Sequence, residues 1–188
     1  METKKVKILE ISKKLGLSHI GSCLSVLPIL EEIYSIKKPL DFVLMDGAHA
    51  HLAHLIFNNP DHAEEMIHRY GIHCDRQAGC DISGGSLGHA GGIAIGLALV
   101  FKTRDIYVIF TDGGMQEGSN WEALRIMKEL SLKNIKCYFN FNDYTALQKT
   151  DTDSLSKMIY SFCPTGQIRL TKNGRGYEGV KGHYIKIK

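Results

Sequence analysis

The chain has 188 residues, of which 44% are hydrophobic and 23% are charged, and its formal net charge at pH 7 is +3. This length and composition are typical of a globular protein, and we expect residues 1–188 to form a single domain. The small net charge argues against a nucleic-acid partner, and no apolar run reaches the ~20 residues that cross a bilayer. The N-terminal residues lack the apolar core of a signal peptide, so we expect a cytoplasmic protein with no membrane partner.

Helix and strand signals alternate along the chain. Helical spacing predicts helices over residues 4–15 and 25–36, with Pro28 in the first turn of the second. Ser119 is expected to begin a later helix through a capping box. Further helices are predicted at 50–57, 61–70, 87–101, 119–130 and 154–162, and strands at 42–45, 106–110, 136–140 and 167–170. This alternation predicts an α/β fold, in which a parallel sheet carries helices on both faces.

The five cysteines are odd in number and form no C-x-x-C pair, a pattern that indicates reduced and mostly buried thiols. A zinc site built from His73, Cys74, Cys80 and another histidine is an alternative. The spacing of these residues matches no common zinc finger.

Two polar residues follow predicted strands of the sheet. Asp112 comes after the strand at 106–110 and Asn142 after the strand at 136–140, and ligands of parallel sheets bind at such carboxyl ends. Magnesium prefers oxygen ligands, which these two side chains and the Tyr144 carbonyl can supply. Gly113 would let the backbone approach a phosphate. The alternative makes Asp112 a turn residue and Asn142 a loop amide.

A glycine-dense loop at residues 84–92 opens the predicted helix at 87–101. Such a loop can bind an anion or a flat ring, or it can serve tight helix packing. Loops and element ends also carry four histidines, whose imidazoles can bind sugar hydroxyls, relay protons or donate to phosphate. These are His19, His49, His73 and His183. The histidines on predicted helices, which we expect to be surface or packing residues, are His51, His54, His62 and His68.

Five motifs follow one another between residues 18 and 142. They read S-H-I-G-S-C-L-S, D-F-V-L-M-D-G-A-H-A, D-I-S-G-G-S-L-G-H-A, T-D-G-G-M-Q-E-G-S-N-W-E-A and N-F-N. In this order they resemble motifs of the N-terminal, thiamine-diphosphate-binding half of transketolases. The resemblance is thinner after Asn142, where L-T-K-N-G-R-G and G-H-Y only echo the pattern of the family.

The resemblance implies the diphosphate-type thiamine-diphosphate-binding fold, with thiamine diphosphate and Mg²⁺ or Ca²⁺ as cofactors. It implies metal ligands at Asp112, Asn142 and the Tyr144 carbonyl. It implies cofactor contacts at Gly85, Leu87, Asp112, Gly113, Asn142 and His183. Catalytic roles are implied for His19, His49 and His73, which would face the reacting carbon and the substrate, and for Glu117, which would couple paired active sites.

Several positions depart from the pattern of the family. Thr111 and Gly114 replace the first glycine and the glutamate of its G-D-G-E motif, and Asn140 replaces an aspartate. One extra residue precedes His49. The segment between Asn142 and the last strand is also shorter than in transketolases, so we expect sugar recognition to differ or to depend on a partner.

In transketolases, a glutamate of a second domain activates the aminopyrimidine of the cofactor, and we expect that domain on another chain. The sequence therefore predicts the small subunit of a split transketolase-like enzyme, which transfers a two-carbon ketol unit between sugars or sugar phosphates. Its expected partner is a separately encoded pyrimidine-binding chain, in an α2β2 assembly. The alternatives are the α subunit of a thiamine-dependent 2-oxo-acid dehydrogenase or decarboxylase, and a non-catalytic remnant of the fold.

Overall fold

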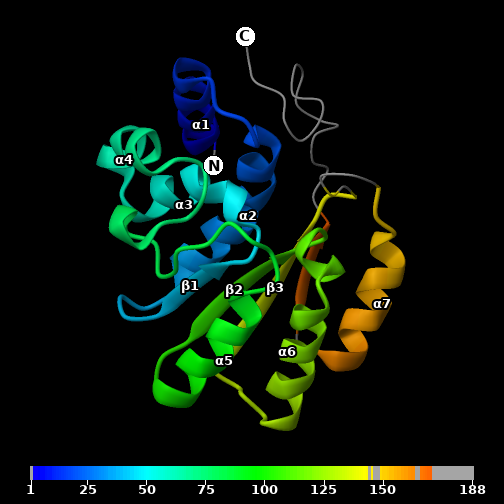
Figure 1. The fold of residues 1–188 in the computed structure, drawn as a ribbon. Coiled ribbons are helices and arrows are strands. Elements are labelled where there is room, and N and C mark those ends of the chain that lie inside the picture. Colours follow the sequence, from blue (N-terminus) through cyan, green and yellow to red (C-terminus); the bar gives the residue numbers. More distant parts are fainter. Residues whose placement is uncertain (1, 144, 146–148, 164–165, 171–188) are drawn as a thin grey trace. The chain divides into compact units, whose positions relative to one another are not determined.

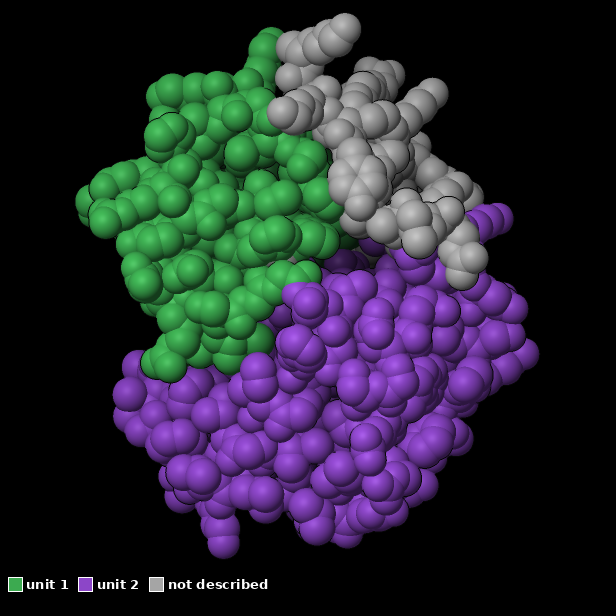
Figure 2. All heavy atoms as spheres, viewed as in Figure 1, with its two compact units in different colours: residues 1–36, 48–85, 171–188 green, residues 37–47, 86–170 purple. Residues whose placement is uncertain are grey.

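The computed structural model describes residues 2–143, 145, 149–163 and 166–170. Its contacts divide the chain into two compact units (Figure 2). Among the described residues, unit 1 consists of 2–36 and 48–85, and unit 2 of 37–47 and the residues from 86 to 170. Each unit is described by itself below. The expectation of a single domain stays a prediction.

Unit 1 contains helices and no strand among its described residues (Figure 1). Helix α2 packs against α1 and α3, and α3 also packs against α4. The left-handed conformation of Gly16, with φ of +61°, follows the end of α1. The helical elements of unit 1 are α1 (Glu2–Leu15), α2 (Ile20–Ile36), η1 (Ala48–Ala50), α3 (His51–Asn58), η2 (Pro60–His62), α4 (Ala63–Tyr70) and η3 (Arg76–Ala78).

Helix α2 begins five residues earlier than the sequence predicts. The expected position of Pro28 in its first turn is therefore wrong, because Pro28 lies inside the helix. Proline lacks the N–H that would bond the carbonyl of Leu24, so this turn has one backbone bond fewer. The other buried residues of α2 compensate for the loss, since Ile29, Leu30 and Ile33 are fully buried.

Unit 2 contains a parallel sheet of strand order β1-β2-β3-β4, as the alternation of elements predicts (Figure 1). Its strands are β1 (Phe42–Met45), β2 (Ile106–Thr111), β3 (Ile135–Phe141) and β4 (Gln167–Leu170). Five consecutive residues of β2, 106–110, are buried. Since successive residues of a strand point to opposite faces, both faces of β2 are covered.

The helical elements of unit 2 follow its strands along the chain. They are α5 (Ala90–Val100), η4 (Gly114–Gln116), α6 (Gly118–Glu129) and α7 (Thr152–Phe162). Helix α5 packs against β2 and α6. The predicted capping box at Ser119 is wrong, because Glu117 occupies the N-cap position and the Ser119 hydroxyl donates to the Gly88 carbonyl at 2.8 Å.

The cysteines agree with the prediction of reduced thiols. None of the five described cysteines forms a disulfide; four are buried, and Cys163 is half-buried. Within the part of the chain that the structure describes, no helix has the combined length and apolar character that crossing a bilayer requires.

Candidate functional site

Asp112 lies at the carboxyl end of β2, in unit 2, and is 1% exposed. Its carboxylate accepts hydrogen bonds from the Gly113 N–H at 3.2 Å and from the Thr150 hydroxyl at 3.3 Å. It also accepts the N–H of Asn142 at 3.0 Å. These neutral donors hold the carboxylate in one orientation, beside the carboxyl end of β3.

Two predicted cofactor residues of unit 2 lie close to one another beside Asp112. A Cβ added to Gly113 would lie 3.5 Å from a methyl group of Leu87. Asn142 is half-buried directly after β3, with its backbone on the Asp112 carboxylate. The fold therefore brings together Asp112, Gly113, Asn142 and Leu87, which lie up to 55 residues apart in the sequence.

Unit 2 contains a second buried carboxylate, that of Asp46 at the end of β1, for which the sequence predicted no role. It accepts the N–H groups of Gly88 and Ala90 at 2.9 and 3.3 Å, and the amide of Asn120 at 2.7 Å. These bonds fix the loop that leads into α5. Burial raises the pKa of Asp46, while the hydrogen bonds from Asn120 and the loop lower it.

Asp46 explains why position 114 is glycine in this chain. A Cβ added to Gly114 would overlap the Asp46 carboxylate, so a glutamate at this position could not coexist with Asp46 in this arrangement. Asn120 ties both residues together, because its amide also donates to the Gly114 carbonyl at 2.8 Å. In this chain a carboxylate reaches the turn after β2 from β1, whereas the resembling motif of transketolases carries a glutamate within that turn.

The structure also explains why a threonine at position 111 can replace the first glycine of the transketolase motif. Its hydroxyl accepts the N–H of Gly114 at 2.9 Å and so closes the turn after β2. Its methyl group lies where a side chain at Gly47 would be. Thr111 and Gly47 therefore fit together as a pair, and the turn does not need glycine at position 111.

Unit 1 brings together the histidines that were predicted to be catalytic. The His19 and His49 rings stack with centroids 4.3 Å apart, and the His49 and His73 centroids are 4.8 Å apart. His19 is 5% exposed, His49 is half-buried and His73 is exposed. We call these residues the histidine row, since they lead from the interior of unit 1 to its surface.

Particular backbone features lie at both ends of the histidine row. His19 has φ of +62°, an uncommon conformation for a residue with a side chain and one that clusters at functional sites. Its Nδ1 is hydrogen-bonded to the Ser18 hydroxyl at 2.8 Å. At the other end, a Cβ added at Gly85 would lie in ordinary contact with the His73 ring, at 3.4 Å. Gly85 was predicted to contact a cofactor, and in this structure it lies against His73.

The remaining predicted site residues divide into two groups. Glu117 is exposed and lies just before α6, beside Gly88. Its expected role in coupling paired active sites stays a prediction. Tyr144 and His183 lie outside the described residues.

The donor set in unit 2 fits a magnesium diphosphate. Asp112 and Asn142 carry hard oxygen atoms at the ends of neighbouring parallel strands. Gly113 carries no side chain that would block an approaching phosphate. The histidine row in unit 1 offers a different chemistry, namely imidazoles suited to sugar hydroxyls and to proton transfer near pH 7.

Known proteins similar to the chain carry transketolase names. It is 30% identical over 170 residues to a 6-deoxy-6-sulfo-D-fructose transketolase subunit of Clostridium sp. (strain MSTE9), covering 77% of this chain and 60% of that one. It is 39% identical over 74 residues to an apulose-4-phosphate transketolase subunit of Actinobacillus succinogenes, covering 37% of this chain and 26% of that one. The chain is therefore similar in sequence to transketolase subunits.

A solved transketolase shares the fold of this transketolase-like chain. The structure of a transketolase mutant of Pichia stipitis, solved in complex with xylulose 5-phosphate, is similar to this chain with a TM-score of 0.69 and 17% sequence identity. The match covers 99% of this chain and 39% of the Pichia chain. No family model matches the sequence. The chain spans less than two thirds of the length of either named relative. These matches confirm the predicted thiamine-diphosphate-binding fold class and do not favour the 2-oxo-acid dehydrogenase alternative.

Proposed function

We propose that this chain is the diphosphate-binding subunit of a split transketolase, which transfers a two-carbon ketol unit between sugars. Thiamine diphosphate and Mg²⁺ or Ca²⁺ are its cofactors, and a separately encoded pyrimidine-binding chain is its partner in an α2β2 assembly. The observation that carries this proposal is the position of Asp112 beside Asn142, at the carboxyl ends of neighbouring parallel strands.

In the proposed site, unit 2 holds the metal and the diphosphate. Asp112 and Asn142 provide metal ligands together with the Tyr144 carbonyl, while Gly113 and His183 contact the diphosphate and Leu87 the aminopyrimidine. The buried hydrogen bonds to Asp112 keep its carboxylate oriented before the metal arrives. When bound, thiamine diphosphate supplies the electron sink for breaking and forming the carbon–carbon bond.

In unit 1, the histidine row is assigned to the sugar. His19, His49 and His73 bind hydroxyl groups and move protons to and from them, which imidazoles do efficiently near neutral pH. The names of both relatives refer to sugars that carry an anionic group, a sulfonate in one case and a phosphate in the other. We therefore expect a ketose donor with an anionic group at the end away from its carbonyl.

Exposed apolar residues of α5 support a partner chain. Ile93, Leu99 and Val100 are 38%, 48% and 72% exposed on a helix that has no charged residue. Burying such side chains is the main source of stability in permanent subunit interfaces. The two named relatives are themselves called subunits.

The test is reconstitution with a candidate pyrimidine-binding chain of transketolase type. The pair should transfer a ketol unit from a phosphorylated ketose to an aldose acceptor, while neither chain should do so alone. Turnover of pyruvate without ketol transfer would reject the transketolase reaction. Calorimetry with Mg²⁺ and thiamine diphosphate tests the binding step, and no heat of binding even with the partner present would favour the non-catalytic remnant.

A further inference from the structure

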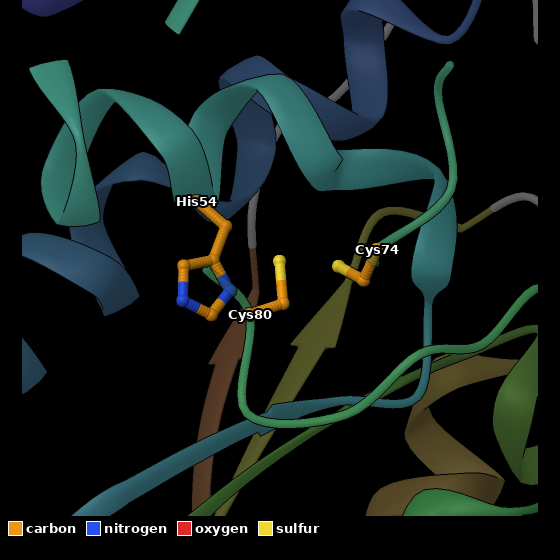
Figure 3. A group of neighbouring side chains, drawn as sticks. All are labelled: His54, Cys74 and Cys80. Atoms are coloured by element: carbon orange, nitrogen blue, oxygen red, sulfur yellow. The ribbon is translucent and has the colours of Figure 1, made fainter. Parts of the chain in front are cut away.

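Unit 1 contains a buried cluster of sulfur and nitrogen ligands separate from the histidine row. One ligand atom each from His54, Cys74 and Cys80 lies within 4.8 Å of the others (Figure 3). The three residues are 2%, 4% and 5% exposed. His54 comes from α3, while the cysteines come from the loop between α4 and Gly85, and the side chains point toward one another in the figure.

The loop that carries the cysteines is held by its own hydrogen bonds. Asp75 caps the turn η3 by accepting the Gln77 N–H at 2.7 Å, and its carbonyl accepts the Cys80 N–H at 3.1 Å. The Asn58 amide, on α3, donates to the Gly79 carbonyl. The loop is thus connected to the helix that supplies His54, and both thiols keep their places without a disulfide.

A second histidine of α3, His51, has the hydrogen bonding of a metal ligand. Its Nδ1 lies 2.7 Å from the Gly71 carbonyl, which can only accept, so Nδ1 carries the proton and Nε2 carries a lone pair. His51 is fully buried, and its side chain interacts with that of Cys80. Metal-bound histidines commonly donate their other N–H to a backbone carbonyl in this way.

The two thiols of the cluster lie beside each other and beside the imidazoles of α3. A dication bound there would coordinate both cysteines as thiolates and release their protons to solvent.

We propose that unit 1 holds a structural Zn²⁺ site, whose ligands are His51, His54, Cys74 and Cys80. Two thiolates and two imidazoles make a common tetrahedral zinc set and a poor set for magnesium or calcium. In a tetrahedral site with bonds of about 2.0–2.3 Å, ligand atoms lie roughly 3.3–3.8 Å apart. The ligand atoms of His54, Cys74 and Cys80 need only a small contraction to reach that geometry, and the interaction of His51 with Cys80 makes His51 the candidate for the fourth ligand.

This assignment corrects the zinc alternative read from the sequence. His73 belongs to the histidine row and is not grouped with the cysteines. The histidine that lies beside Cys74 and Cys80 is His54. The sequence spacing could not indicate this, because His54 precedes Cys74 by a helix and a turn. Since His73 directly precedes Cys74, the zinc would also fix the backbone that carries one end of the row. The zinc site does not depend on the proposed transketolase activity.

The test is the metal content of the full chain, purified under reducing conditions and without chelator. Elemental analysis should find about one zinc per chain, and the double variant Cys74→Ser/Cys80→Ser should lose it. The matched control is Cys137→Ser, which changes a buried cysteine of unit 2 and should keep the zinc. Circular dichroism of each variant shows whether it still folds.

A spectroscopic measurement on the wild-type chain tests the proposal even if the double variant does not fold. The wild-type chain, stripped of metal and loaded with Co²⁺, should show tetrahedral cobalt bands with thiolate charge transfer, and zinc should abolish them. Bound zinc should also protect Cys74 and Cys80 from alkylation. Absence of zinc together with absence of the cobalt bands in reduced protein overturns the site, as does recovery of a Cys74–Cys80 disulfide from metal-free protein. Full zinc retention in His51→Ala removes His51 from the ligand set.

Discussion

The two units of this chain use different means to position polar groups. In unit 2, backbone topology does most of the positioning, because parallel pairing of β2 and β3 brings Asp112 and Asn142 to the same edge. In unit 1, loops and helix α3 position the histidine row and the cluster of His54, Cys74 and Cys80, with contacts between side chains and a left-handed residue at His19. Sheet topology can be inferred from a sequence, whereas such loop geometry cannot.

The largest expected effect concerns the site that the sheet positions. Asp112→Asn should lower ketol transfer by the reconstituted pair by more than about 100-fold, because an amide is a weaker ligand than a carboxylate for a hard dication. The steady-state rate at saturating Mg²⁺ measures this. Asp153→Asn, at an exposed residue of α7, is the matched control and should leave the rate unchanged. Near wild-type activity in Asp112→Asn would contradict the site.

The next effect concerns the packing between Asp46 and Gly114. Gly114→Ala should reduce the free energy of unfolding by about 2 kcal/mol, because the added methyl group overlaps a buried carboxylate. Asp46→Ala should cost about 3 kcal/mol by leaving buried donors without an acceptor. The double variant should cost less than the sum, with a coupling energy of about 1–2 kcal/mol.

Denaturant unfolding of the four proteins in this cycle gives the coupling energy. Gly118→Ala is the matched control, since nothing lies within 4 Å of the added Cβ. It should leave the free energy of unfolding nearly unchanged. Additive losses in the cycle would mean that Asp46 and Gly114 do not constrain each other.

A smaller effect is expected from the histidine row. His19→Asn should lower turnover about 10- to 100-fold, as expected for the loss of one or two hydrogen bonds to substrate, while the affinity for thiamine diphosphate stays the same. Asparagine tolerates the left-handed backbone at this position. Calorimetry and steady-state kinetics separate the two quantities, with the exposed His68→Ala as control. Lost cofactor affinity at unchanged turnover would show that His19 serves the cofactor.

The smallest effect is a pH dependence of stability. Burial raises the pKa of Asp46 in the folded chain, so folding favours the protonated carboxyl. The stability from this group is fully present below the unfolded pKa of about 4 and is lost as the pH rises through the folded pKa. Between pH 3 and pH 7, the wild type should therefore lose stability relative to Asp46→Asn. Parallel unfolding curves at all pH values would contradict this sign.

The sequence predicts much of unit 2 for a physical reason. Continuous apolar runs such as residues 106–110 mark strands covered on both faces, and polar residues directly after them mark the ligand edge. The predicted positions of Asp112 and Asn142 at the carboxyl ends of strands are confirmed, because both signals are local in the sequence. Whether these residues bind metal stays a prediction.

The sequence fails where a residue's role depends on a distant partner. Asp46 reads as the end of a strand, and its bonds to Gly88 and Asn120 need contacts across 42 and 74 residues. His51 and His54 lie on a helix and were expected to be packing or surface residues, yet His54 faces two cysteines from a later loop. The sequence predicts Ser119 as a helix cap, but in the structure its hydroxyl donates a hydrogen bond to the distant Gly88 carbonyl.

The arrangement of Asp46 and Gly114 makes the two positions interdependent. A Cβ at position 114 would overlap the Asp46 carboxylate, so a carboxylate at position 46 requires glycine at position 114. A variant that carries the glutamate of the resembling transketolase motif at position 114 therefore needs a smaller residue at position 46 as well.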